Sequence, residues 1–255
     1  MNLKLVIKIG TSTLAHAGGR LNIRRTESLC KIISDLKNSG HEVILVSSGA
    51  IGMGTGKLSF LERPSDMATK QAAAAVGQCE LMYTYDRLFS QYNHIVAQIL
   101  VTAADFRMDD RHQNFSSTLN RLLDLGVLPI INENDTIATE EISVGDNDTL
   151  AAMVATSARA DLLILLSDID GLYTADPHID PNAVLISQVR TLSEDILKLG
   201  GQSGSALGTG GMRTKLSAAQ ICTEAGCDMI IANGSDPEIL YRIMDGEAVG
   251  THFFA

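Results

Sequence analysis

The stretch LKLVIKIGTS at residues 3–12 decides the fold. Leu3 to Ile9 is a short apolar run interrupted only by Lys4 and Lys8, which is typical of a strand. Gly10 follows directly, at the turn where the run ends. A glycine turn lets backbone N–H groups approach a phosphate closely, and a lysine ammonium adds positive charge. The stretch therefore predicts a first strand that ends at a phosphate-binding turn.

Outward from this stretch, short apolar runs alternate with longer amphipathic segments. The run at 42–46 has almost no polar alternation, as expected where helices cover both faces of a sheet. Such alternation predicts an α/β fold of right-handed βαβ units around a mostly parallel, doubly wound sheet. The glycine-rich and then polar segment 52–66 predicts a mobile loop. We expect strands at 3–9, 42–46, 94–101, 127–131, 161–166 and 228–232, and helices at 23–37, 65–92 (one or two), 113–125, 148–157, 211–225 and 237–244.

Composition limits the classes of protein that the chain can belong to. Its 255 residues are 45% hydrophobic, enough for one large core, so we expect a single domain over 1–255. A net charge of −10 argues against binding to nucleic acid or an acidic membrane. The four cysteines form no C-x-x-C pair and predict reduced thiols in a cytoplasmic protein. No apolar run approaches the roughly 20 residues of a membrane span.

A second lysine stands beside a glycine-rich segment near the other end of the chain. Lys215 closes the segment GTGGMRTK at 208–215. Other polar motifs follow predicted strands, at 47–50, 132–135 and 167–168, and ligands of doubly wound sheets bind at the carboxyl ends of strands. Two lysine sites in one chain place positive charge on both sides of a phosphate. This pattern favours phosphoryl transfer over simple nucleotide binding.

Two common nucleotide fingerprints do not fit the chain. A P-loop around Gly56-Lys57 fails because Ile51 replaces its first glycine and Leu58 its Ser or Thr. A dinucleotide-binding G-x-G-x-x-G fails because its last glycine is replaced by Lys57 in one place and by Arg213 in the other. The phosphate site must therefore be of another kind.

Six motifs in order resemble the amino acid kinase family, over essentially the whole chain. They are KIGTS at 8–12, SSGA at 47–50, INEND at 131–135, GDND at 145–148, GLYTADP at 171–177 and GTGGMRTK at 208–215. Those at 131–135 and 145–148 resemble the glutamate 5-kinases within it. The resemblance implies a three-layer αβα sandwich. It also implies transfer of the γ-phosphoryl of ATP to the side-chain carboxylate of L-glutamate, the first step of proline biosynthesis.

The same resemblance implies roles for individual residues. Lys8 and Lys215 would be catalytic, with Asp148 holding both; an alternative for Asp148 is a carboxylate favoured at a helix N-terminus. Glutamate would be bound by an acceptor-side set, for part of which ordinary turn chemistry is the alternative. The acceptor-side set is Ser48, Asn134, Asp135 and Asn147, and the ATP-side set is Lys8, Gly10, Ser167, Asp168, Thr209, Gly210, Gly211, Met212, Arg213, Thr214 and Lys215.

Further expectations concern cofactors, partners and domain content. Mg²⁺ would arrive with ATP, since we find no protein cluster with metal-ligand spacing. The resemblance implies feedback inhibition by proline and a homo-oligomer. It also implies that the chain lacks the C-terminal PUA domain of many bacterial relatives. Two alternatives stay open: another member of the family, such as an acetylglutamate kinase, and a non-catalytic amino-acid sensor.

Overall fold

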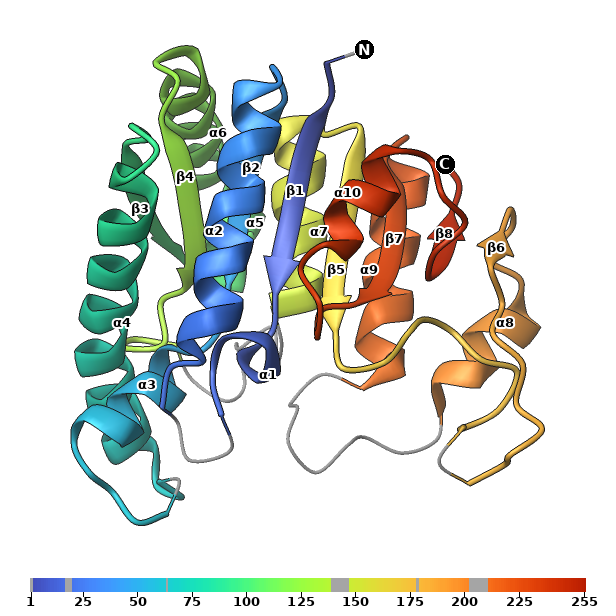
Figure 1. Ribbon diagram of the computed structural model, residues 1–255, viewed down its shortest axis with the longest axis horizontal. Coiled ribbons are helices and arrows are strands. Elements are labelled where there is room, and N and C mark those ends of the chain that lie inside the picture. Colours follow the sequence, from blue (N-terminus) through green and yellow to red (C-terminus); the bar gives the residue numbers. More distant parts are fainter. Residues whose placement is uncertain (1, 17–19, 63, 139–146, 178, 202–210) are drawn as a thin grey trace.

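A computed structural model describes residues 2–16, 20–62, 64–138, 147–177, 179–201 and 211–255 (Figure 1). Within these residues the strands form one eight-stranded sheet in the order β3-β4-β2-β1-β5-β7-β8-β6. Its pairs are parallel except for β7 with β8. The strands are β1 Lys4–Ile9, β2 Glu42–Ser47, β3 Val96–Val101, β4 Leu128–Glu133, β5 Leu162–Ser167, β6 Gln188–Val189, β7 Asp228–Asn233 and β8 Thr251–Phe253.

Helices cover both faces of this sheet, so the predicted three-layer αβα sandwich is confirmed (Figure 1). One core cluster joins the sheet to α2, α3, α4 and α10, and the other joins it to α6, α7 and α9. The helices are α1 Thr11–Leu14, α2 Ile23–Asn38, α3 Ala50–Lys57, α4 Met67–Ser90, α5 Ala103–Arg107, α6 Asp109–Asp124, α7 Asn147–Ala158, α8 Glu194–Lys198, α9 Met212–Glu224 and α10 Ile239–Met244.

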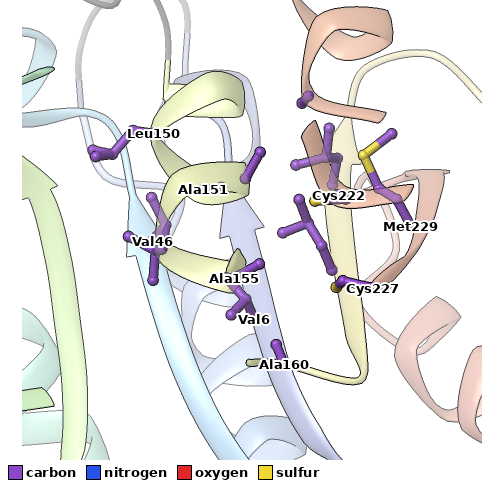
Figure 2. Close-up of a cluster of buried hydrophobic side chains, with 14 of the residues drawn as sticks. Val6, Val46, Leu150, Ala151, Ala155, Ala160, Cys222, Cys227 and Met229 are labelled. Atoms are coloured by element: carbon purple, nitrogen blue, oxygen red, sulfur yellow. The ribbon is translucent and has the colours of Figure 1, made fainter. Parts of the chain in front are cut away.

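Strand β1 lies in the middle of the sheet and is buried on both faces. Leu5, Ile7 and Ile9 belong to the core cluster under α2 and α4. Val6 belongs to the cluster under α7 and α9, and Figure 2 shows Val6 beside Ala155 of α7. Because side chains alternate along a strand, Lys8 shares the face of Val6. The first strand thus directs its lysine toward the helices α7 and α9.

The predicted loop at 52–66 is wrong over its first part, because Ala50–Lys57 forms the helix α3. Its glycines serve close packing against α4. A Cβ on Gly54 would lie 1.8 Å from the carbonyl oxygen of Ala73, and one on Gly77 would lie 1.8 Å from that of Ala50. Glycine lowers helix propensity by roughly 1 kcal/mol, but here the tertiary contact outweighs that cost. Residues 58–62 and 64–66 lie outside the helices.

The other expected strands and helices are present, with bounds that shift by a few residues. The segment 65–92 forms one helix, α4. The short elements α1, α5, α8, β6 and β8 were not expected, since two to five residues are too few to show a period. In the part of the chain that the structure describes, no helix is both long enough and apolar enough to cross a membrane.

Candidate active site

Asp148 bridges the two lysines that the sequence singled out. Its Oδ1 lies 2.6 Å from Nζ of Lys8, and its Oδ2 accepts a hydrogen bond of 3.0 Å from Nζ of Lys215. Asp148 is wholly buried, while Lys8 and Lys215 are 8% and 6% exposed. The expected contact of Asp148 with both lysines is therefore confirmed. We call these three residues the lysine–aspartate bridge.

Three elements bring the lysine–aspartate bridge together. Lys8 lies near the carboxyl end of β1, Asp148 in the first turn of α7 and Lys215 in the first turn of α9. Helices α7 and α9 pack against each other over the face of β1 that carries Lys8. A helix N-terminus attracts a carboxylate and repels an ammonium, so the helix dipole favours Asp148 there but not Lys215. The position of Lys215 is therefore explained by its ion pair.

The charges of the bridge do not cancel. Burial alone raises the pKa of the Asp148 carboxyl, but attraction to Lys8 and Lys215 and the hydrogen bonds from both outweigh it and hold that pKa below its ordinary value. Asp148 is therefore an anion at neutral pH. Two ammonium groups and one carboxylate give these three buried side chains together a net charge of about +1. The bridge is thus suited to meet a phosphate.

The start of α9 supplies further residues of the expected ATP-side set. The hydroxyl of Thr214 donates to the carbonyl oxygen of Gly211 over 2.7 Å and lies 3.3 Å from Oδ2 of Asp148. Met212 is half-buried and Arg213 is exposed in the same turn. These positions bring the beginning of α9 beside the lysine–aspartate bridge. Thr209 and Gly210, like the glycine and aspartate at 145–146, lie outside the described residues.

The turn after β1 and the end of β5 form the other part of the expected ATP side. A Cβ on Gly10 would lie 3.8 Å from Nζ of Lys8 and 3.7 Å from the carbonyl oxygen of Leu166. A side chain at position 10 would therefore be in van der Waals contact with the Lys8 ammonium. Ser167 is buried and its hydroxyl donates to Oδ1 of the exposed Asp168 over 3.2 Å. Since β5 pairs with β1, these side chains lie next to the strand that carries Lys8.

On the other side of β1, an amide network joins the ends of β2 and β4 to α7. Nδ2 of Asn147 lies 2.8 Å from the hydroxyl of Ser48, 2.9 Å from Oδ1 of Asn132 and 3.1 Å from the carbonyl oxygen of Ser47. Gly49, with a φ of 105°, turns the chain from β2 into α3 in a conformation that favours glycine. Two of the four expected acceptor-side residues, Ser48 and Asn147, are therefore in direct contact.

The other two acceptor-side residues lie in the turn that follows β4. Oδ1 of Asn134 accepts a hydrogen bond from the hydroxyl of Thr136, and the carbonyl oxygen of Asn134 accepts from the N–H groups of Ile137 and Ala138. The side chain of Asn134 thus makes the turn contact that was its alternative interpretation. Asp135 is half-buried in the same turn. The turn follows Asn132 directly, so it borders the amide network.

Comparison with known proteins identifies the family of the chain. The model of the amino acid kinase family matches residues 4–233. The chain belongs to the amino acid kinase family. Curated relatives include a "Glutamate 5-kinase" of Clostridium acetobutylicum, 53% identical over 98% of this chain and 94% of its own length. Another "Glutamate 5-kinase", from Caldanaerobacter subterraneus subsp. tengcongensis, is 51% identical over 98% of this chain and 68% of its own length.

Solved structures share the fold of this amino acid kinase family member at low sequence identity. A carbamate kinase from Giardia lamblia bound to AMP-PNP has a TM-score of 0.70 and 17% identity, over 99% of this chain and 98% of its own. A UMP kinase from Bacillus anthracis has a TM-score of 0.68 and 17% identity, over 100% of this chain and 97% of its own. These likenesses support the fold.

The sequence did not mark two members of the amide network as site residues. Asn132 appeared only within the motif at 131–135, yet its side chain is 1% exposed and contacts Asn147. Gln78 of α4 is 7% exposed, and its Oε1 accepts a hydrogen bond of 2.9 Å from Nδ2 of Asn132. The available signal was the position of Gln78 on the apolar face of α4, between Ala74 and Leu81. A buried amide there requires a partner, but periodicity does not identify which one.

Proposed function

We propose that this chain transfers the γ-phosphoryl group of ATP to the side-chain carboxylate of L-glutamate, giving L-glutamyl 5-phosphate, the first step of proline biosynthesis. The observation that carries the proposal is the buried lysine–aspartate bridge, in a chain about half identical to relatives named glutamate 5-kinase. The bridge provides the charge that a phosphoryl transfer needs. The relatives indicate the acceptor.

The chemistry of this acceptor requires no general base. A glutamate side chain has an ordinary pKa of about 4.3, so it is already a carboxylate nucleophile at neutral pH. The difficulty is electrostatic, because two like charges about 4 Å apart repel by roughly 4 kcal/mol at an effective dielectric of 20. Lys8 and Lys215 offset this repulsion and stabilise the charge of the transferring group. Asp148 holds both ammonium groups at the place where that charge develops.

The order of strands supports a division of labour across β1. The strands β2 and β4, which lead to Ser48 and to Asn134 and Asp135, lie on one side of β1 in the sheet. The strands β5 and β7 lie on the other side, with Ser167 and Asp168 at the end of β5. A chain that leaves a central strand in opposite directions forms a crevice at the carboxyl ends of its strands, where ligands bind. Glutamate and ATP therefore approach Lys8 from opposite sides.

The individual roles follow from this division. Ser48, Asn134, Asp135 and Asn147 bind glutamate, with Asp135 as the anionic partner of its α-ammonium group. Lys8, Lys215 and Asp148 act at the transferring phosphoryl group. Helix α9 presents the backbone N–H groups of its first turn toward phosphate oxygens. The ATP side comprises Lys8, Gly10, Ser167, Asp168, Thr209, Gly210, Gly211, Met212, Arg213, Thr214 and Lys215.

Mg²⁺ is proposed to enter with ATP, held by phosphate oxygens and water. Both carboxylate oxygens of Asp148 face lysines, so this buried anion is not available as a ligand. Among the described residues there is no group of three His, Cys, Asp or Glu side chains that could hold a metal ion. Bound by phosphate oxygens, Mg²⁺ neutralises part of the phosphate charge.

Neither alternative function explains the site as well. The acetylglutamate kinase alternative is not favoured by the relatives, whose printed name is glutamate 5-kinase. A non-catalytic sensor of amino acids needs an acceptor pocket but no pair of buried lysines at a phosphate site. Two ammonium groups held by one carboxylate are what a phosphoryl transfer requires, which favours an enzyme over a sensor.

We also propose a single domain over 1–255, a homo-oligomer and inhibition by proline, as the resemblance to the family implies. The family match over residues 4–233 supports the single domain. We place the activity in the cytoplasm, where ATP is available. There the thiols of the four free cysteines, three of them buried, would stay reduced.

An assay with ATP, Mg²⁺ and hydroxylamine tests the proposed reaction, because hydroxylamine converts an acyl phosphate into a coloured hydroxamate. We expect hydroxamate with L-glutamate and little with N-acetylglutamate or aspartate. Folded protein that gives no glutamate-dependent hydroxamate would contradict the proposal. Hydroxamate with N-acetylglutamate alone would instead favour the acetylglutamate kinase alternative.

A further inference from the structure

A chain of hydrogen bonds extends the amide network from α7 into α4. Asn147 bonds the side chain of Asn132, and Asn132 bonds the side chain of Gln78. Gln78 lies in the middle of α4. Both Asn132 and Gln78 are more than nine-tenths buried. The two amides therefore connect a helix without any expected site residue to the acceptor side.

The direction of each hydrogen bond in this chain is determined by a backbone group. The N–H of Glu133 can only donate, and its acceptor at 2.9 Å is Oδ1 of Asn132. The same oxygen accepts from Nδ2 of Asn147 over 2.9 Å. Nδ2 of Asn132 must therefore face Gln78, which must present its Oε1 as the acceptor. The orientation of the Asn132 amide, and with it the place of Asn147, depends on that oxygen.

Stability alone does not account for a glutamine at position 78. Its Nε2 is buried and has no hydrogen-bond partner among the described residues. A buried donor without a partner costs about 1–3 kcal/mol, so an apolar side chain of similar size would avoid that cost. Replacing Gln78 would also leave Nδ2 of Asn132 without its acceptor. The two effects oppose each other, so the net contribution of Gln78 to stability is expected to be small.

We propose that Gln78 is a positioning residue of the acceptor side, which orients Asn132 and through it Asn147 for binding of the amino-acid substrate. The proposal rests on the function proposed above. Gln78 does not touch the substrate in this account, and its effect is on the affinity for glutamate. The ATP side lies across β1 and should not respond.

Three substitutions at position 78 test this role. Gln78→Met removes the acceptor oxygen at nearly constant size, Gln78→Asn keeps an amide that is one methylene too short, and Gln78→Glu keeps an oxygen at the right length. Thr84→Val is the matched control. Thr84 is 5% exposed on the same helix, and its hydroxyl donates to the carbonyl oxygen of Glu80 within α4.

We expect Gln78→Met and Gln78→Asn to raise KM for glutamate about tenfold, as loss of one oriented hydrogen bond does. KM for ATP should stay within about twofold in both variants, and the melting temperature of Gln78→Met should stay near that of the wild type, as for Thr84→Val. Gln78→Glu should restore most of the affinity for glutamate. If Gln78→Met does not fold, Gln78→Asn carries the test.

Other outcomes would overturn the proposal. Equal changes in both KM values, or a lower melting temperature with unchanged KM, would make Gln78 a structural residue. A KM for glutamate as high in Gln78→Glu as in Gln78→Met would indicate direct contact of Nε2 with the substrate. The rise in melting temperature that glutamate itself produces measures binding without turnover. If glutamate raises the melting temperature of the wild type but no hydroxamate forms, the proposed reaction is wrong. The role of Gln78 in glutamate binding can then still be tested by that rise in melting temperature.

Discussion

The two sides of the candidate site are held by different forces. The lysine–aspartate bridge consists of buried ions, with Asp148 between Lys8 and Lys215. The amide network consists of neutral groups, in which Asn147 contacts Ser48 and Asn132. Both are built at the carboxyl edge of the same sheet, and consecutive residues of α7, Asn147 and Asp148, belong one to each. One turn of helix thus joins a charged region to a neutral one.

This difference matches what each side is expected to meet. A phosphate has several charged oxygens and changes its charge distribution during transfer, so fixed ammonium groups nearby stabilise it strongly. An amino acid must be distinguished by shape and by the direction of its polar groups, and oriented amides and hydroxyls do this. We therefore expect changes in the bridge to affect turnover and stability. Changes in the amide network should affect the affinity for one substrate.

The largest effect should come from Asp148→Asn, which keeps the shape of the side chain and removes its charge. Two buried ammonium groups would then face each other without their anion. Loss of one partner of a buried ion pair costs about 3–5 kcal/mol. We expect the free energy of unfolding at neutral pH, measured with urea, to fall by that amount. Turnover should fall at least as far as in the variant Lys215→Ala, discussed below.

The same variant has a distinct dependence on pH. Because the folded-state pKa of Asp148 lies below its ordinary value of 3.8, its charge stabilises the fold above that pH, and this contribution is lost as the pH falls through the folded pKa. The difference in unfolding free energy between wild type and Asp148→Asn should therefore shrink below pH 3.8. A difference that is constant with pH would show that the charge of Asp148 does not stabilise the fold.

A smaller but still large effect is expected from Lys215→Ala. Loss of a group that stabilises charge in the transition state lowers kcat by roughly 10²-fold or more. Lys198→Ala is the matched control, because Lys198 pairs with Asp195 at the surface with a side chain that is 70% exposed. Exposed pairs contribute about 0–1 kcal/mol, so the control should keep both kcat and stability. Near wild-type kcat in Lys215→Ala would remove Lys215 from the transfer step.

Much of the bridge could be predicted from the sequence, because its members stand at positions that are unusual for their residue type. Lys8 interrupts a buried strand, and Lys215 follows a glycine pair at a helix start. The amide network was harder to predict from the sequence. Gln78 and Asn132 are 54 residues apart, and neither position reveals its partner. Contacts of this kind depend on how α4 packs on the sheet, which local pattern does not contain.

The same limit explains the error at α3. The glycines of 52–56 predict a loop by propensity alone, whereas Gly54 and Gly77 allow two helices to approach within contact of their backbones. A tertiary contact then decided between helix and loop. The closeness of α3 to α4 also has a consequence for the site. Ser48 stands just before α3 and Gln78 lies within α4, so the packing of these helices sets the spacing of the amide network.

A smaller effect than in the Asp148 and Lys215 variants should come from Asp135→Ala, in the turn after β4. If Asp135 binds the α-ammonium of glutamate, its loss removes a charge-assisted hydrogen bond worth about 1.5–3 kcal/mol, or roughly ten- to hundredfold in KM for glutamate. KM for ATP and the unfolding free energy should change little. Asp86→Ala, at an exposed position of α4, is the control and should leave both KM values unchanged. Equal rises in the two KM values would assign Asp135 to the architecture of the turn, and the acceptor side would then lack an anchor for the ammonium group.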